Sequence, residues 1–123
     1  MSLKIIIYHN PRWGKSREAV SLLKKTSAEL EIVEYLKQPL TKKELGDLSH
    51  KLGLHPKEFV RKRESDFKEQ DLKDKLEDSE VLFNAMEKYP KIMERPIAVK
   101  GHRAVIGRPP EKVLSLVDKQ ISI

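Results

Sequence analysis

KIIIYHNPRWGKSREAVSLLKK, residues 4–25, is the stretch that decides the fold of this 123-residue chain. Its first five residues, 4–8, form a run rich in β-branched residues, typical of a strand buried on both faces in a parallel sheet. Residues 15–25 place apolar side chains at helical spacing, which predicts a helix packed on that sheet. Residues 31–36 (EIVEYL) predict a second strand. The chain therefore opens with a β-α-β unit, whose crossover is expected to be right-handed.

The middle of the sequence is predicted to be helical. Thr41 followed by Glu44 matches a capping box, and Gly53 is expected to end the helix that begins there. Residues 64–78 are highly charged and indicate a loop or an exposed helix. A further helix is expected to begin at Asp78 or Ser79 and to end before the proline at position 90.

The last third returns to strands. Residues 96–99 and 103–106 are expected to pair as a hairpin through a tight turn at 100–102, and a final helix is expected after the Pro109-Pro110 break. The fold class is therefore α/β, with a mixed sheet of four strands in the order β-α-β, helices, β-β-α. At this length we expect a single domain over residues 1–123.

The composition excludes several kinds of chemistry. The chain has no cysteine, which rules out disulfides, thiolate metal sites and iron–sulfur clusters. Four scattered histidines lack the spacing of metal ligands, so no metal site is predicted. No apolar run approaches the roughly 20 residues of a membrane span. We also expect no signal peptide and a cytoplasmic location.

The charge is unevenly distributed along the chain. Residues 1–55 and 95–123 each carry a net charge of +4, whereas residues 56–94 carry −2. If the two ends fold together, their field would attract a small anion or a nucleic acid, and the alternative is an ordinary solvated basic surface. Aromatic residues make up only 6% of the chain, and no helix-turn-helix or finger pattern is present, so nucleic-acid binding is not expected.

Three short motifs are candidates for function. Residues 8–17 (YHNPRWGKSR) connect the first strand to the first helix, where free backbone N–H groups and the helix dipole favour an anion. An ordinary basic loop is the alternative interpretation. Residues 95–97 (RPI) begin the third strand, and residues 106–111 (IGRPPE) precede the last helix. On spacing alone, Arg108 is a solvated residue at the start of that helix.

In this order, the three motifs resemble the glutaredoxin-dependent arsenate reductase family, over about residues 4–118. The resemblance implies a thioredoxin-like fold with a helical insert at about residues 39–94. It also implies a cis peptide bond before Pro96.

The resemblance assigns roles to individual residues. The family nucleophile is a cysteine, and its position here is Trp13. His9 matches a histidine that keeps the thiol ionised, and Ser16 matches a serine that hydrogen-bonds the thiolate. Three arginines match the cluster that binds the oxyanion, for which planar guanidinium groups are suited: Arg61, Arg95 and Arg108. Arg61 has the alternative of being a surface charge.

Trp13 decides the expected mechanism. An indole has only an N–H donor and no group that ionises readily, so thiol-based reduction is predicted to be lost. Glutathione and glutaredoxin are the co-substrates of the family, and the missing thiol argues against that role for them here. By family analogy, glutaredoxin stays a candidate partner. The indole has three possible arrangements: it caps the site, stacks on a guanidinium group or plugs the pocket. A natural substitution, an engineered change and a sequence error are all open as its origin.

Three functions follow from the resemblance. The first is a pseudoenzyme that keeps an oxyanion site for arsenate or a phosphate-like ion. The second is an active arsenate reductase by family analogy, which is a weak warrant for chemistry. The third is a partner-binding regulator like the Spx relatives, which bind RNA polymerase.

Overall fold

The computed structural model describes residues 4–117. The chain divides into two compact units, one made of residues 1–33 and 95–123 and the other of residues 34–94. We call them the sheet unit and the helical unit, and each is described by itself. The predicted α/β class with a four-stranded mixed sheet is confirmed.

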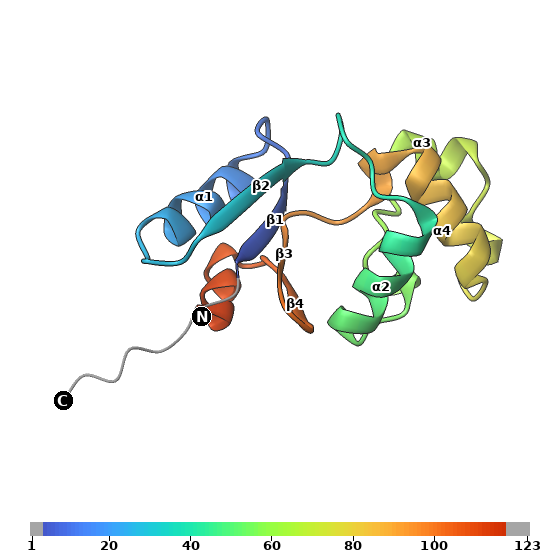
Figure 1. The fold of residues 1–123 in the computed structure, drawn as a ribbon. Helices are drawn as coiled ribbons and strands as arrows, with labels where there is room; N and C mark the ends of the chain where they lie inside the picture. The colour runs from blue at the N-terminus through green and yellow to red at the C-terminus, as the bar shows by residue number, and fades with distance from the viewer. Residues whose placement is uncertain (1–3, 118–123) are drawn as a thin grey trace. The chain divides into compact units, whose positions relative to one another are not determined.

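The sheet has the strand order β2-β1-β3-β4 (Figure 1). Its strands are β1 (Ile5–His9), β2 (Leu30–Glu34), β3 (Ile97–Lys100) and β4 (Arg103–Ile106). β3 runs antiparallel to β1, with Ala98 opposite Ile7, and it also pairs antiparallel with β4, with Ala98 opposite Val105. The predicted hairpin over the last two strands is therefore confirmed.

One face of this sheet is covered by two helices, α1 (Gly14–Lys24) and the 3₁₀ helix η4 (Pro110–Leu116). Alternate residues of a strand point to the same face, so Ile5 and Ile7 of β1 face these helices together. The core cluster joins side chains from both helices and two strands: Ile5, Ile7, Ala19, Val20, Leu23, Ala98, Val113 and Leu116.

The first strand differs from its prediction. Residues 4–8 were expected to be buried on both faces, but burial alternates along β1, with Ile6 and Tyr8 only half-buried. The helices α1 and η4 cover the face of Ile5 and Ile7, which explains why those two side chains are the fully buried ones.

The helical unit contains α2 (Lys42–Leu52), α3 (Ser65–Glu69) and α4 (Ser79–Lys88), with 3₁₀ turns at Pro56–Glu58, Lys73–Lys75 and Pro90–Ile92. The predicted capping box of α2 is confirmed. The Glu44 N–H donates to Thr41 Oγ1 at 3.1 Å, and the Thr41 N–H donates to Glu44 Oε1 at 3.0 Å. Gly53 ends the helix in the left-handed region with a φ of 68°.

The charged stretch 64–78 contains α3 and the turn Lys73–Lys75. Phe67 and Leu72 from this stretch are buried within the helical unit, at 4% and 3% exposure. These two apolar side chains hold a segment in which most residues are exposed and charged.

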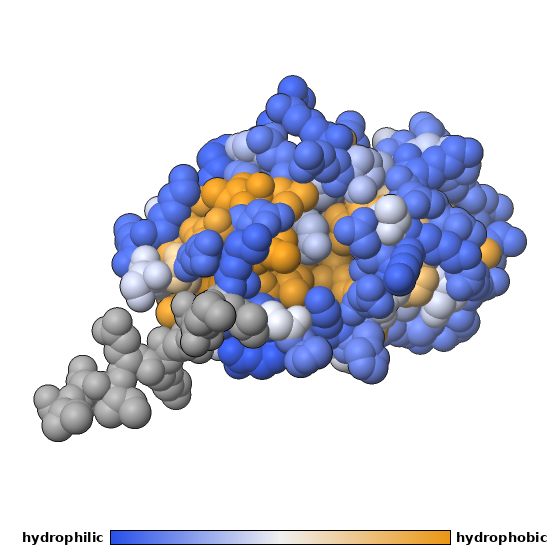
Figure 2. Space-filling model, in the orientation of Figure 1, coloured by the Kyte–Doolittle hydropathy of each residue, from blue (hydrophilic) through white to orange (hydrophobic). Residues whose placement is uncertain are grey.

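The surface is mostly hydrophilic in the view of Figure 2, with an apolar area where Figure 1 shows β1 and β2. Within residues 4–117, the exposed large apolar side chains are Ile32 of β2 and Leu114 of η4. Over the same range, no helix has both the length and the apolar character that crossing a membrane requires.

Two glycines provide a test of this packing. A Cβ atom at Gly107 would lie 2.8 Å from Pro96 Cγ and 3.0 Å from Val113 Cγ1, whereas at Gly46, inside α2, nothing lies within 4 Å. We expect Gly107→Ala to lower the free energy of unfolding by about 1–3 kcal/mol through overpacking. Gly46→Ala should raise it by about 0.5–1 kcal/mol, because alanine favours a helix interior. Urea unfolding of both variants measures this, and an unchanged midpoint for Gly107→Ala would contradict the packing described.

Candidate functional site

The loop between β1 and α1 is held by its own backbone and side chains. The Arg12 N–H donates to Asn10 Oδ1 at 3.0 Å, and the Trp13 N–H donates to the Asn10 carbonyl oxygen at 3.1 Å. Arg17 Nη1 donates back to the Pro11 carbonyl oxygen at 3.0 Å. These bonds place Trp13 at the N-cap of α1 in an extended conformation, with no side-chain cap.

His9 and Ser16 meet below this loop. His9 ends β1 and is 8% exposed, while Ser16 lies in the first turn of α1 and is fully buried. Their Nδ1 and Oγ atoms are 2.7 Å apart, and the Asn10 N–H donates to the same Oγ at 3.0 Å. A hydroxyl has one hydrogen and two lone pairs, so it satisfies both partners with either tautomer of His9. The structure therefore brings these two predicted site residues together.

Trp13 contacts two of the predicted oxyanion-binding arginines. The guanidinium carbon of Arg95 lies 4.3 Å from the indole ring centroid, and that of Arg108 lies 4.8 Å from it. Arg95 is buried just before β3, and Arg108 is exposed just after β4. Three arrangements were open for the indole, and in the structure it stacks on the guanidinium groups of Arg95 and Arg108.

Both arginines precede a cis peptide bond. The bonds Arg95–Pro96 and Arg108–Pro109 are cis. The resemblance implied the first of them, and the sequence analysis did not anticipate the second.

Arg61, the third predicted arginine, belongs to the helical unit. Its Nη1 pairs with Glu64, and its Nε lies 3.8 Å from Glu94 Oε1. Its backbone N–H donates to the Ile92 carbonyl oxygen at 2.5 Å. Within its own unit, Arg61 thus lies between two carboxylates that partly neutralise it.

The electrostatics favour an anion on the sheet unit. Residues 1–33 and 95–123 carry twelve basic and five acidic side chains, whereas residues 34–94 carry thirteen and fourteen. The first turn of α1 has no acidic residue, and it carries Lys15 and Arg17 at the end of the helix where the dipole prefers negative charge. Between residues 4 and 117, no group of three or more histidine or acidic side chains is arranged to hold a metal ion.

Two exposed ion pairs formed by residues outside this loop shift the pKa of one partner each. Lys57 Nζ hydrogen-bonds Glu77 Oε1 at 2.6 Å and lowers the pKa of that carboxyl. In the second pair, Lys4 Nζ donates a hydrogen bond of 2.5 Å to Glu31 Oε1, and this bond raises the pKa of Lys4.

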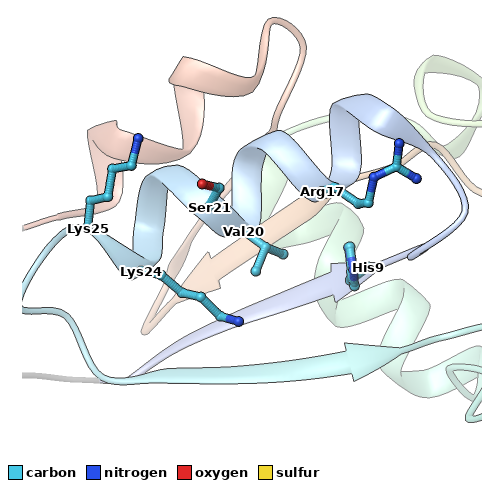
Figure 3. Close-up of a pocket in the computed structure, with 6 residues that line it drawn as sticks. All are labelled: His9, Arg17, Val20, Ser21, Lys24 and Lys25. Atoms are coloured by element: carbon cyan, nitrogen blue, oxygen red, sulfur yellow. The ribbon is translucent and has the colours of Figure 1, made fainter.

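Sequence reasoning missed a group of basic residues on α1. Lys24 and Lys25 line a hollow together with Arg17 and His9 (Figure 3). The signal was present in the sequence, because positions 17, 24 and 25 are seven and eight residues apart and so share one helix face. Arg17 was instead assigned only to the loop at residues 8–17.

Comparisons with known proteins agree with each other. The ArsC family model matches residues 8–116. The chain is 46% identical over 118 residues to the uncharacterized protein YfgD of Escherichia coli, which covers 95% of this chain and 99% of that protein. It is 38% identical over 111 residues to an arsenate reductase of Neisseria meningitidis, covering 89% of this chain and 95% of that protein. An arsenate reductase from Vibrio cholerae has a solved structure with a TM-score of 0.89 and 37% identity, covering 95% of this chain and all of that one.

The buried hydroxyl of Ser16 should be needed for stability. Replacing it by alanine removes the partner of both His9 Nδ1 and the Asn10 N–H. We expect Ser16→Ala to lower the free energy of unfolding by about 1–3 kcal/mol, the usual cost of leaving a buried polar group unsatisfied. Ser21→Ala, at an exposed position on the same helix, should change it by less than about 0.5 kcal/mol. Equal effects of the two substitutions in denaturant unfolding would show that the His9–Ser16 contact is absent in solution.

Proposed function

The chain belongs to the ArsC family, and on that premise we propose that it is a non-catalytic member that binds a small tetrahedral oxyanion. Its fold is the thioredoxin-like one of the family. In this proposal, Trp13 stands at the position of the family nucleophile. The observation that carries the proposal is the indole at the start of α1, stacked on Arg95 and Arg108 in a chain without cysteine. A cytoplasmic location is part of the same proposal.

The loss of reduction follows from the missing sulfur. Thiol-based arsenate reduction starts when a thiolate attacks arsenic and displaces an oxygen as water. Only the deprotonated sulfur is nucleophilic enough for this step. The chain has no cysteine at any position, and an indole provides neither the bond to arsenic nor the electrons. A mixed disulfide with glutathione cannot form, so glutaredoxin has no bond to resolve.

Binding of an oxyanion is compatible with the indole. A cation–π contact uses the face of a guanidinium group, whereas its N–H donors lie in the plane and point outward. An oxyanion is bound through that edge. The start of α1 adds its dipole and the positive side chains of Lys15 and Arg17. We therefore assign Arg95 and Arg108 as the main contacts.

Arg61 keeps the oxyanion-binding role that the resemblance gives it, as part of the proposal. Its two carboxylate neighbours, Glu64 and Glu94, reduce the positive charge that it can offer. The effect of Arg61→Ala on anion binding tests this role separately from the other two arginines.

The second candidate is an active arsenate reductase. The names of several relatives favour it, since proteins from Neisseria meningitidis and Haemophilus influenzae that are 38% and 37% identical to this chain are called arsenate reductases. This candidate requires the two electrons to come from outside the protein without a protein thiol as relay.

Anion binding is measured by calorimetry with arsenate, phosphate and sulfate, and by the emission of Trp13. Because Trp13 is the only tryptophan of the chain, its fluorescence reports on this site alone. We expect at least one of these anions to bind. Arg108→Ala should weaken the affinity roughly tenfold, which corresponds to the loss of one charged hydrogen bond. Arg103→Ala, at an exposed position of β4, should leave the affinity within about twofold, since surface charges are largely screened. If none of the three anions binds, the proposed site does not exist.

Catalysis is measured in a coupled glutathione and glutaredoxin assay with arsenate. The unmodified chain should match the blank without protein, because no sulfur is present to react. Trp13→Cys should give turnover, and Trp13→Ser, which removes the indole without supplying a thiol, should give none. Arsenite formed by the unmodified chain above the blank would overturn the proposal and favour the second candidate.

A further inference from the structure

A basic hollow of about 450 Å³ lies along one face of α1 in the sheet unit (Figure 3). Four of its six lining residues come from that helix, Lys25 is the C-cap residue that follows it, and His9 at the end of β1 is the sixth. The residues from α1 and its C-cap are Arg17, Val20, Ser21, Lys24 and Lys25. The spacing i, i+3, i+4, i+7 and i+8 places them on one face. This face is built from charged and polar side chains around Val20, which is 6% exposed.

The residues that line the hollow are spread along α1, with positively charged side chains toward both ends of the helix. In Figure 3, Arg17 and His9 lie toward the start of α1, and Lys24 and Lys25 lie toward its end. Seven residues separate Arg17 from Lys24, which corresponds to about 10 Å along the helix axis. Val20 and Ser21 lie between them and offer an apolar side chain and a hydroxyl group.

The positive charge of the hollow is not compensated within the part of the chain that the structure describes. The six lining residues include no carboxylate. Over residues 4–117, the ion pairs involve neither Arg17 nor Lys24 nor Lys25. Arg17 gives one N–H to the Pro11 carbonyl oxygen, which leaves the other donors of its guanidinium group for a ligand.

The helix dipole explains only part of this arrangement. Lysines in the last turn of a helix are favoured by the negative end of the dipole, which accounts for Lys24. Arg17 lies in the first turn, where a positive charge is disfavoured. A bound anion would offset that cost and the repulsion between the like charges of the hollow.

We propose that this hollow binds an elongated organic polyanion that carries an acid group at each end. Arg17 and His9 bind one acid group, Lys24 binds the other with Lys25 adding positive charge nearby, and Val20 and Ser21 contact the chain between them. The acid groups are phosphates or carboxylates, since both suit these donors. This site goes beyond the proposed oxyanion site, with which it shares His9 and Arg17, whereas Lys24 and Lys25 belong to the hollow alone.

Calorimetry on the full chain tests the proposal with three probes: fructose 1,6-bisphosphate, the linear dicarboxylate suberate, and inorganic phosphate. We expect the bisphosphate or the dicarboxylate to bind, and the better of the two identifies the acid group. The double variant Lys24→Gln/Lys25→Gln should weaken that binding at least about tenfold, because it removes one of the two charged ends. Ser21→Glu, which puts a carboxylate into the hollow, should weaken it at least as much.

Lys112→Gln is the matched control, since it removes an exposed lysine of η4 that does not line the hollow. We expect it to change the affinity by less than about twofold. The substituted side chains are exposed, so the variants should fold normally, and circular dichroism checks this. Equal losses in the control and in the double variant would reveal a diffuse attraction and overturn the proposal, as would absent binding of both long probes. A higher affinity for duplex DNA than for the bisphosphate and the dicarboxylate would also overturn the proposal.

Inorganic phosphate separates this proposal from the proposed function. The double variant should bind it as the unmodified chain does, because Arg95 and Arg108 are unchanged. If the double variant instead loses phosphate binding as strongly as bisphosphate binding, both anions bind at a single site for small anions. That result would overturn the proposal of an elongated ligand. If the bisphosphate binds and neither phosphate nor arsenate does, the result supports the proposed ligand of the hollow. It then contradicts only the proposed oxyanion site.

Discussion

The stacking of Trp13 on the guanidinium groups of Arg95 and Arg108 is the contact on which the whole site depends. It joins the start of α1 to the residues that flank the β3–β4 hairpin, three segments that are far apart in the sequence. Each such contact contributes about 0.5–2 kcal/mol, more where it is shielded from water. The negative face of the indole also offsets the repulsion between two positive side chains that lie against the same ring. An aromatic ring is therefore a stable occupant here, although it has no thiol chemistry.

The remainder of the site has a structural explanation that does not need a reactive sulfur. Ser16 Oγ satisfies both His9 Nδ1 and the Asn10 N–H, so the two residues that the resemblance assigns to a thiolate also hold the loop in place. In the proposed non-catalytic protein, their contribution to the fold is enough to retain them. The positive charge is different, because Lys15 and Arg17 lie at the end of α1 where the helix dipole disfavours cations. Between residues 4 and 117, no ion pair involves Arg17, Lys24 or Lys25. Excess charge on the sheet unit therefore points to an anionic ligand, whereas the His9–Ser16 pair alone does not.

The sequence predicted those features whose signals are local. Thr41, Glu44 and Gly53 mark the two ends of α2 by capping geometry alone, and the turn at 100–102 defines the hairpin. Burial in the charged stretch 64–78 was not predictable, because Phe67 and Leu72 become buried only through tertiary packing. The contacts of Trp13 depend on which strand ends meet the start of α1, so three possible arrangements of the indole remained until the structure distinguished them. The basic face of α1 was detectable from the spacing of Arg17, Lys24 and Lys25, but the motif at residues 8–17 contains only the first of these residues.

The most direct measurement of the central contact is the proton NMR spectrum of the arginine side chains. Protons above an indole ring are shifted upfield by its ring current. The account predicts that the δ-protons of Arg95 and Arg108 lie well upfield of those of the exposed Arg103, and that they return to ordinary positions in Trp13→Leu. Unshifted resonances for Arg95 and Arg108 in the unmodified chain would contradict the account, because the indole would then not cover the two guanidinium groups.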